Sequence, residues 1–174
     1  QAGTPNTNTS ETEGFTVTTP PPPPASQIMD DGGAGFAVSG GWTSFAGNNT
    51  LFGYDSDFNY AAAGTGSETA SWTFTGLAAG NYEVSVTWVE FSNRATNAPY
   101  TIYDGASQVG SSILINQELA PAADHVEGGE PFQIISASVS ITSGTLVVEL
   151  ANNANGYVIA DAVRIGVYTL IEVQ

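Results

Sequence analysis

Hydrophobic and polar residues alternate with a period of two in short runs along most of the chain after residue 27. The clearest run is 82–88, in which every second side chain is apolar: Tyr82, Val84, Val86 and Trp88. This alternation is typical of strands that bury one face, and no stretch shows the period of an amphipathic helix. The same pattern predicts further strands over 68–75, 100–103, 108–116, 136–142, 145–150 and 157–165.

Turn-forming residues separate these runs at short intervals, for example at 76–81, at Ser143-Gly144 and in the Asn-rich segment 152–156. Many short strands joined by short turns favour two packed antiparallel sheets. The sequence therefore predicts an all-β fold, an antiparallel jelly-roll-type β-sandwich over 28–165. Trp72 and Trp88 fall on the inward faces of their strands, and we expect both in the core.

The two ends of the chain differ from this central part. Residues 1–27 are rich in Thr and Asn and contain an unbroken run of prolines at 20–24. Such a run adopts polyproline II, about 15 Å long at ~3.1 Å per residue, and cannot join a sheet. We expect an extended N-terminal arm with a polyproline spacer. Residues 166–174 are apolar on both faces, which predicts an extra C-terminal strand that pairs with a sheet of this or another copy.

The charge of the chain excludes two classes of function. Seventeen acidic residues stand against two basic ones, and the formal net charge is −15 at pH 7. Such a field repels a phosphate backbone and anionic lipids, so we expect no nucleic-acid binding. There is no apolar run of roughly 20 residues, so we expect no membrane insertion. Few charges and abundant Thr, Ser, Asn and Gly are typical of a secreted bacterial surface protein, which predicts an extracellular or cell-surface location.

Several motifs resemble one known domain in order and spacing. They are DDGGAGF at 30–36, GGW at 40–42, YAAAGTG at 60–66, SNRATNAPY at 92–100, NQ at 116–117 and GYVIADAVR at 156–164. Over residues 28–165 the chain resembles the golvesin/xanthan-lyase type carbohydrate-binding-like domain of secreted bacterial proteins. The resemblance implies a non-catalytic β-sandwich that is usually an appendage of larger extracellular proteins. The arm and the extra strand depart from it.

Arg94 and Arg164 are the two cations of the chain. A guanidinium has five donors and keeps its charge, so it suits tying segments together through carboxylates and carbonyls. Arg164 follows Asp161 by three residues in the same predicted strand, so the two should point to opposite faces. We expect structural roles for Arg94, Asp161 and Arg164, with Arg94 reaching a distant acid. The alternative for Arg94 is a hydrogen bond to a sugar or to a substrate carboxylate.

Two acidic segments are candidate calcium sites. Asp55, Asp57 and Asn59 have the D-x-D-x-N spacing that begins many calcium loops. Tyr60 stands where the turn glycine belongs, and no closing Glu follows, so an acidic turn before a strand is the favoured interpretation. Asp30-Asp31-Gly32 forms a similar strand-end turn, with cation binding alongside Asp161 as the alternative. Ca²⁺ is therefore the one cofactor considered.

Catalysis has little support in the sequence. His125 is the sole histidine and follows Asp124 in a polar segment without any recognisable nucleophile motif. Zero cysteine excludes thiolate metal sites. Paired carboxylates for glycoside cleavage depend on separation in space, which sequence does not give. We expect a chain that is not an enzyme.

An aromatic segment is the best candidate for binding a sugar. Trp42 lies near Phe45, Phe52 and Tyr54 in an irregular region, where a ring can stack on a sugar or cap one end of the sandwich. The candidate carbohydrate-binding residues are Trp42, Tyr54, Asn93 and Asn97.

Two functions remain open. The favoured hypothesis is a structural subunit of a bacterial surface fibre or matrix, which self-associates when its arm or a terminal strand adds to a sheet edge of the next copy. The alternative is a carbohydrate-binding module that recognises extracellular polysaccharide.

Overall fold

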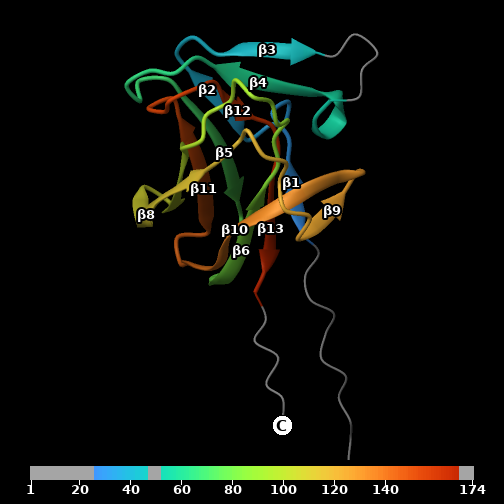
Figure 1. The fold of residues 1–174 in the computed structure, drawn as a ribbon. Coiled ribbons are helices and arrows are strands. Elements are labelled where there is room, and N and C mark those ends of the chain that lie inside the picture. Colours follow the sequence, from blue (N-terminus) through green and yellow to red (C-terminus); the bar gives the residue numbers. More distant parts are fainter. Residues whose placement is uncertain (1–25, 47–51, 169–174) are drawn as a thin grey trace, which may run out of the picture.

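Two five-stranded antiparallel sheets form the body of the protein in the computed structural model, which describes residues 26–46 and 52–168 (Figure 1). In sheet order, the first contains β1 (Gln27–Met29), β13 (Val163–Val167), β6 (Gly80–Val86), β10 (Glu130–Ile141) and β9 (His125–Glu127). The second contains β2 (Phe36–Ser39), β5 (Thr69–Thr75), β11 (Thr145–Ala151), β7 (Ala98–Asp104) and β8 (Ser107–Ile115).

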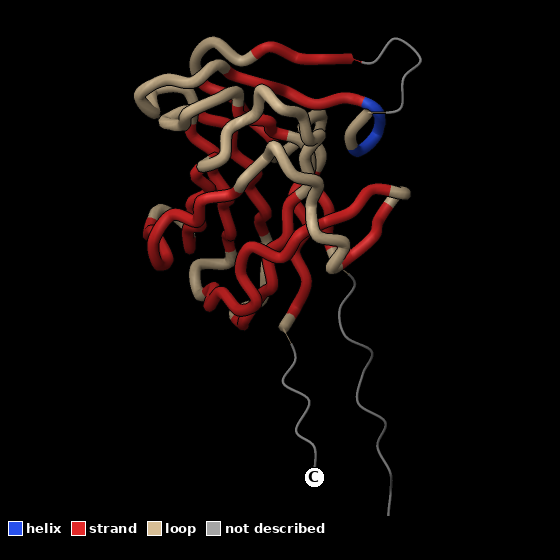
Figure 2. Tube along the Cα trace, viewed as in Figure 1, coloured by secondary structure: helices blue, strands red, loops and turns tan. Residues whose placement is uncertain are grey.

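A smaller three-stranded sheet lies at one end of the molecule (Figure 1). It contains β12 (Val158–Ala160), β4 (Asp57–Ala61) and β3 (Thr43–Ala46), in that order, and the 3₁₀ turn η1 (Tyr54–Ser56) leads into β4. Figure 2 shows most of the long loops beside this sheet, away from the end of β13. The long loops and the small sheet together build the region described below as the candidate site.

The core forms where the inward faces of the two large sheets meet. In β5, buried residues alternate with partly exposed ones, and β11, its neighbour in the same sheet, has the same alternation. Trp72 is 1% exposed and its Nε1 donates to the Asp161 carbonyl, while Trp88 is 3% exposed and donates to the Leu119 carbonyl. Both tryptophans are core residues, as the alternation predicts, and each indole N–H has a partner.

The antiparallel all-β sandwich is confirmed, with differences in single strands. The predicted strand 136–142 is the second half of the longer β10, whose pairing with β6 has two register shifts. Five short strands (β1, β2, β3, β4 and β9) have no counterpart in the sequence prediction because they span only three to five residues. A period of two cannot be recognised reliably over so few positions.

The predicted strand 157–165 is divided between two sheets. β12 ends at Ala160 and pairs with β4, whereas β13 begins at Val163 and pairs with β6 and β1. The chain crosses from one sheet to the other at residues 161–162. The expectation that Asp161 and Arg164 share one strand is therefore wrong, because the crossing separates them. The two side chains do not pair with each other: Asp161 accepts the Tyr54 N–H, and Arg164 pairs with Glu83 and Glu127.

The two ends are described only in part. Gly166 and Val167 complete β13, so the predicted C-terminal strand begins as a continuation of the preceding one. Residues 1–25 and 169–174 lie outside the described residues, and the domain boundaries at 27/28 and 165/166 stay predictions. No helix in the described part of the chain has the length and apolar character needed to span a membrane.

Candidate functional site

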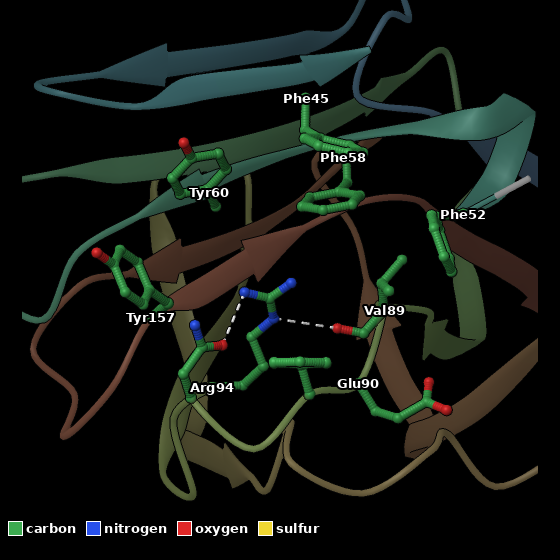
Figure 3. Close-up of a pocket in the computed structure, with 10 residues that line it drawn as sticks. Phe45, Phe52, Phe58, Tyr60, Val89, Glu90, Arg94 and Tyr157 are labelled. Carbon is green, nitrogen blue, oxygen red and sulfur yellow. Dashed lines mark hydrogen bonds between the residues drawn. The ribbon is translucent and has the colours of Figure 1, made fainter. Parts of the chain in front are cut away.

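A pocket of about 490 Å³ lies between the three-stranded sheet and the segment 89–94 that follows β6 (Figure 3). Most of its wall is aromatic: Phe45, Phe52, Phe58, Tyr60, Phe91 and Tyr157. Val89, Glu90, Asn93 and Arg94 complete the lining. An apolar wall with a few polar groups is the usual composition of a small-ligand site.

Strand alternation in β4 builds one wall of this pocket. Phe58 and Tyr60 are two residues apart and point to the same face of the small sheet. Phe45 is paired with Phe58 across β3 and β4, and the two rings stack with centroids 4.9 Å apart. Tyr157, just before β12, meets Tyr60 edge-on at 5.9 Å.

Four aromatic side chains at this pocket are open to solvent. The exposed fractions are 39% for Phe45, 47% for Phe52, 61% for Phe91 and 39% for Tyr157. Large apolar side chains are normally scattered singly on a soluble surface, so their convergence on one concavity points to a binding surface.

Arg94 occupies the middle of the pocket, beneath the ring of Phe58 (Figure 3). Its guanidinium carbon lies 5.7 Å from the Phe58 centroid and 5.8 Å from that of Phe91, within the range of cation–π attraction. Nε donates to the Val89 carbonyl at 3.3 Å, and Nη1 donates to Asn93 Oδ1 at 3.0 Å. Two of the five N–H donors are thus used, which leaves three for a ligand.

The expectation that Arg94 reaches a distant carboxylate is wrong for the described residues, among which it makes no ion pair. Burial lowers the pKa of Arg94, but a guanidinium remains charged at neutral pH. A partly buried cation without an anionic partner is costly in an apolar setting, and an oxygen-rich ligand would relieve that cost.

The backbone around Arg94 is held by the segment before β12. The Ala95 N–H donates to the Tyr157 carbonyl at 2.8 Å, and the Tyr157 N–H donates to the Asn93 carbonyl at 3.2 Å. Gly156 permits this approach, because a Cβ at that position would lie 2.5 Å from the Arg94 carbonyl oxygen. Two segments about 60 residues apart in sequence are thereby fixed side by side.

The four predicted carbohydrate-binding residues do not form one site. Asn93 lines the pocket, but Trp42 packs against the core, and the Tyr54 ring meets Phe132 edge-on at 5.8 Å. Asn97 Oδ1 accepts a hydrogen bond from the Asn155 N–H at 2.9 Å and so holds the loop 152–156. In the sequence, the clustering of Phe45, Phe52, Phe58 and Tyr60 within one short segment could have indicated an aromatic pocket. Nothing in the sequence links the distant Tyr157 to these residues.

A second cluster of polar side chains lies at the end of β1. Asp30, Asp31 and Asp57 have carboxylate oxygens within 4.8 Å of one another. Asn59 Nδ2 donates to Asp31 Oδ2 at 2.6 Å. Of the predicted calcium ligands, the structure therefore brings Asp30, Asp57 and Asn59 together with Asp31, whereas the exposed Asp55 is not part of the cluster.

The carboxyl groups of this cluster sit in an unfavourable environment for negative charge. Burial, with the nearby negative Asp57, raises the pKa of Asp30 to about 6 and that of Asp31 to about 7. Asp161 is 1% exposed and close by, and burial raises its pKa as well, although its carboxylate accepts the Tyr54 N–H at 3.1 and 3.2 Å. Removing a carboxylate from water disfavours its charged form.

Arg164 lies elsewhere, in a charge network on the first sheet. Its Nη1 pairs with Glu83 and its Nε with Glu127, both at 3.2 Å, so it connects β13 with β6 and β9. His125 Nε2 also contacts Glu83, at 2.5 Å. Neither cation of the chain is therefore paired with the aspartate cluster.

The fold is that of a jelly-roll carbohydrate-binding module. A family 35 module, CBM35 from Cellvibrio japonicus Abf62, has a TM-score of 0.53 at 16% identity, over 83% of this chain and 95% of that one. The CBM36-1 domain of a multidomain xylanase from the hindgut metagenome of Trinervitermes trinervoides has a TM-score of 0.54 at 16% identity, over 84% of this chain and 100% of that one. At these identities the likeness shows the fold.

The chain belongs to the Golvesin C-terminal domain family, whose model matches residues 27–167. Xanthan lyase from Paenibacillus is similar at 25% identity with a TM-score of 0.67. The match covers 83% of this chain but only 13% of that enzyme. No curated protein sequence matches the chain. The golvesin/xanthan-lyase resemblance inferred from the motifs is thus confirmed.

Proposed function

We propose that the chain is a carbohydrate-binding module that holds an extracellular polysaccharide in the aromatic pocket around Arg94. The observation that carries this proposal is the convergence of partly exposed aromatic rings on a guanidinium with three available donors. The family and the carbohydrate-binding modules of the same fold support it.

The chemistry of the pocket suits a sugar. A pyranose ring has apolar C–H faces, which pack on aromatic rings such as Phe91 and Tyr157, and a rim of hydroxyl groups. The free Arg94 donors meet hydroxyl or carboxylate oxygens, and the Glu90 carboxylate accepts from hydroxyls. These groups bind and orient without bond cleavage, and we propose that any catalysis belongs to other domains of a larger secreted protein.

The fibre hypothesis stays a prediction. It depends on an N-terminal arm and a C-terminal strand, and most of both lies outside the described residues. No contact among the described residues favours self-association over glycan binding, so the carbohydrate-binding alternative is the proposed function.

Affinity electrophoresis in gels containing xanthan, xylan, β-1,3-galactan or β-glucan tests the proposal. We expect at least one polysaccharide to retard the protein. Phe91→Ala should weaken that retardation about five- to tenfold, because an aromatic contact contributes about 1 kcal/mol beyond its buried area. Arg94→Gln should weaken it further, because it removes the charge and most donors.

Leu114→Ala is the matched control. Leu114 is 63% exposed, as Phe91 is 61% exposed, but it lies in β8, outside the pocket lining. The control should migrate like the unmodified protein in every gel. Equal retardation of all four proteins, or no retardation by any polysaccharide, would exclude this pocket as the glycan site.

A further inference from the structure

The aspartate cluster has the geometry of a cation site. Two oxygens that bind one Ca²⁺ at about 2.4 Å lie at most about 4.8 Å apart. Ligand oxygens of Asp30, Asp31 and Asp57 satisfy this limit pairwise. They come from the turn after β1 and from the first residue of β4, so the convergence is a product of the tertiary fold.

Three carboxylate oxygens in the cluster lack any hydrogen-bond donor. They are the Oδ1 atoms of Asp30, Asp31 and Asp57, which make up three of the five such buried side-chain atoms in the described part of the chain. Asp31 is only 7% exposed as a whole residue, so solvent does not compensate for the missing donor. Buried polar groups are normally satisfied, and their concentration at one point indicates a missing positive partner.

The surroundings add negative charge rather than relieving it. Asp55 acts on Asp30 as a further negative charge. Asp161 lies buried beside the cluster, and its pKa is raised by burial and by the negative charges of Asp30, Asp31 and Glu130. The two arginines are committed elsewhere, and Asn59 supplies a single N–H to Asp31. The remaining ways to neutralise the cluster are protons on the carboxyl groups or a bound cation.

We propose that Asp30, Asp31 and Asp57 bind a hard divalent cation such as Ca²⁺ at the end of β1. The donor set consists of oxygens alone, which selects a hard cation over zinc or copper. The D-x-D-x-N spacing predicts Asp55 as a ligand beside Asp57. In the structure, Asp30 and Asp31 lie beside Asp57 instead, and Asp55 lies outside the cluster.

The position of this site links it to the pocket wall. Asp57 and Asn59 lie on the face of β4 opposite to Phe58 and Tyr60, because alternate residues of a strand point to opposite faces. A bound cation therefore fastens the turn after β1 to the back of the strand that carries the aromatic wall. Its first effect is on stability, which is measurable without any glycan.

The experiment uses the full 174-residue chain, freed of metal with a chelator and dialysed into 150 mM NaCl at pH 7.5. CaCl₂ is titrated by calorimetry, and thermal melts are recorded with and without 1 mM CaCl₂. We expect one saturable site and a rise in the melting midpoint of about 3 °C or more, because a ligand that binds only the folded state stabilises it.

Asp31→Asn should abolish both the heat and the shift, and Asp57→Asn provides a second test should the first variant fold poorly. Asp55→Asn is the matched control, since it removes the same charge from the same region but lies outside the cluster. It should keep one saturable site and the rise in melting midpoint, with only a slightly weaker affinity because Asp55 adds negative charge near Asp30. No heat and no shift in the unmodified protein would overturn the proposal, as would equal losses in Asp31→Asn and Asp55→Asn.

Discussion

Single buried polar side chains hold the three-stranded sheet beside the pocket in place, and Gln117 is the clearest case. Gln117 is fully buried, and its Nε2 donates to the Ile159 carbonyl at 2.8 Å while its Oε1 accepts the Ile159 N–H at 2.9 Å. Nε2 also donates to the Tyr100 hydroxyl at 3.1 Å. The Ile159 N–H in β12 therefore depends on the Gln117 side chain, and the Ile159 carbonyl accepts its shorter bond from Gln117 and a longer one, at 3.4 Å, from the Tyr100 hydroxyl.

Gln117→Leu should destabilise the fold by about 2 kcal/mol, because it leaves the buried Ile159 N–H without a partner, at a cost of about 1–3 kcal/mol. The Ile159 carbonyl would keep only the long bond from the Tyr100 hydroxyl, at 3.4 Å. Urea unfolding measures the change. Gln108→Leu is the control, since Gln108 is exposed and its side chain makes one bond, to the Gly110 carbonyl. A loss below about 1 kcal/mol for Gln117→Leu would show that Ile159 finds other partners.

Asp104 gives a prediction on pH at the same scale. Its carboxylate accepts hydrogen bonds from the backbone N–H and the hydroxyl of both Thr142 and Ser143. These bonds lower the pKa of Asp104, the Ser143 hydroxyl most. An acid with a depressed folded pKa stabilises the protein above its unfolded pKa of about 3.9, and loses that effect as the pH falls toward the folded pKa.

We therefore expect Asp104→Asn to lower the melting midpoint at pH 7. Scanning calorimetry from pH 7 to pH 2.5 should show a constant difference in melting midpoint between Asp104→Asn and the unmodified protein down to about pH 4. Below about pH 4 this difference should shrink, because the unmodified protein loses the stabilisation as Asp104 takes up a proton. A difference that grows as the pH falls would contradict the assigned role.

At the scale of elements, the close approach of the segments around Arg94 and Tyr157 shapes the site.

Sequence patterning predicted the long strands, because seven-residue alternation in β5 and β11 is unambiguous. It missed β3 and β4, which carry Phe45, Phe58 and Tyr60, because short strands give too few positions for a period. It also missed the crossing at residues 161–162, because the change from one sheet to the other depends on which strands pair in three dimensions.

Gly156→Ala should destabilise the fold by about 2 kcal/mol, because the new Cβ would meet the Arg94 carbonyl at 2.5 Å and force the two segments apart. Glycan affinity should fall with it. Gly80→Ala is the control, since a Cβ there meets nothing within 4 Å. Urea unfolding that gives the same midpoint for both variants would disprove the steric role of Gly156.

The whole molecule is a sandwich whose proposed glycan pocket and proposed cation site share one strand, β4. The family and the fold class were predictable from motif order and from alternation. The pairing of Arg94 with aromatic rings rather than an acid was not, because residues 45–60, 89–94 and 157 meet only in three dimensions. The same holds for Asp31, whose burial beside Asp57 has no signature in the sequence.

A titration of ¹⁵N-labelled protein with an oligosaccharide from the polysaccharide that retards it tests the glycan site most directly. Bound sugar should shift the Arg94 Nε–H signal and the backbone signals of residues 89–94 and 157, with saturation at one site. Signals around Asp104, at the other end of β7, should stay in place. Shifts confined to other loops, with the Arg94 signal unmoved at saturation, would contradict the account.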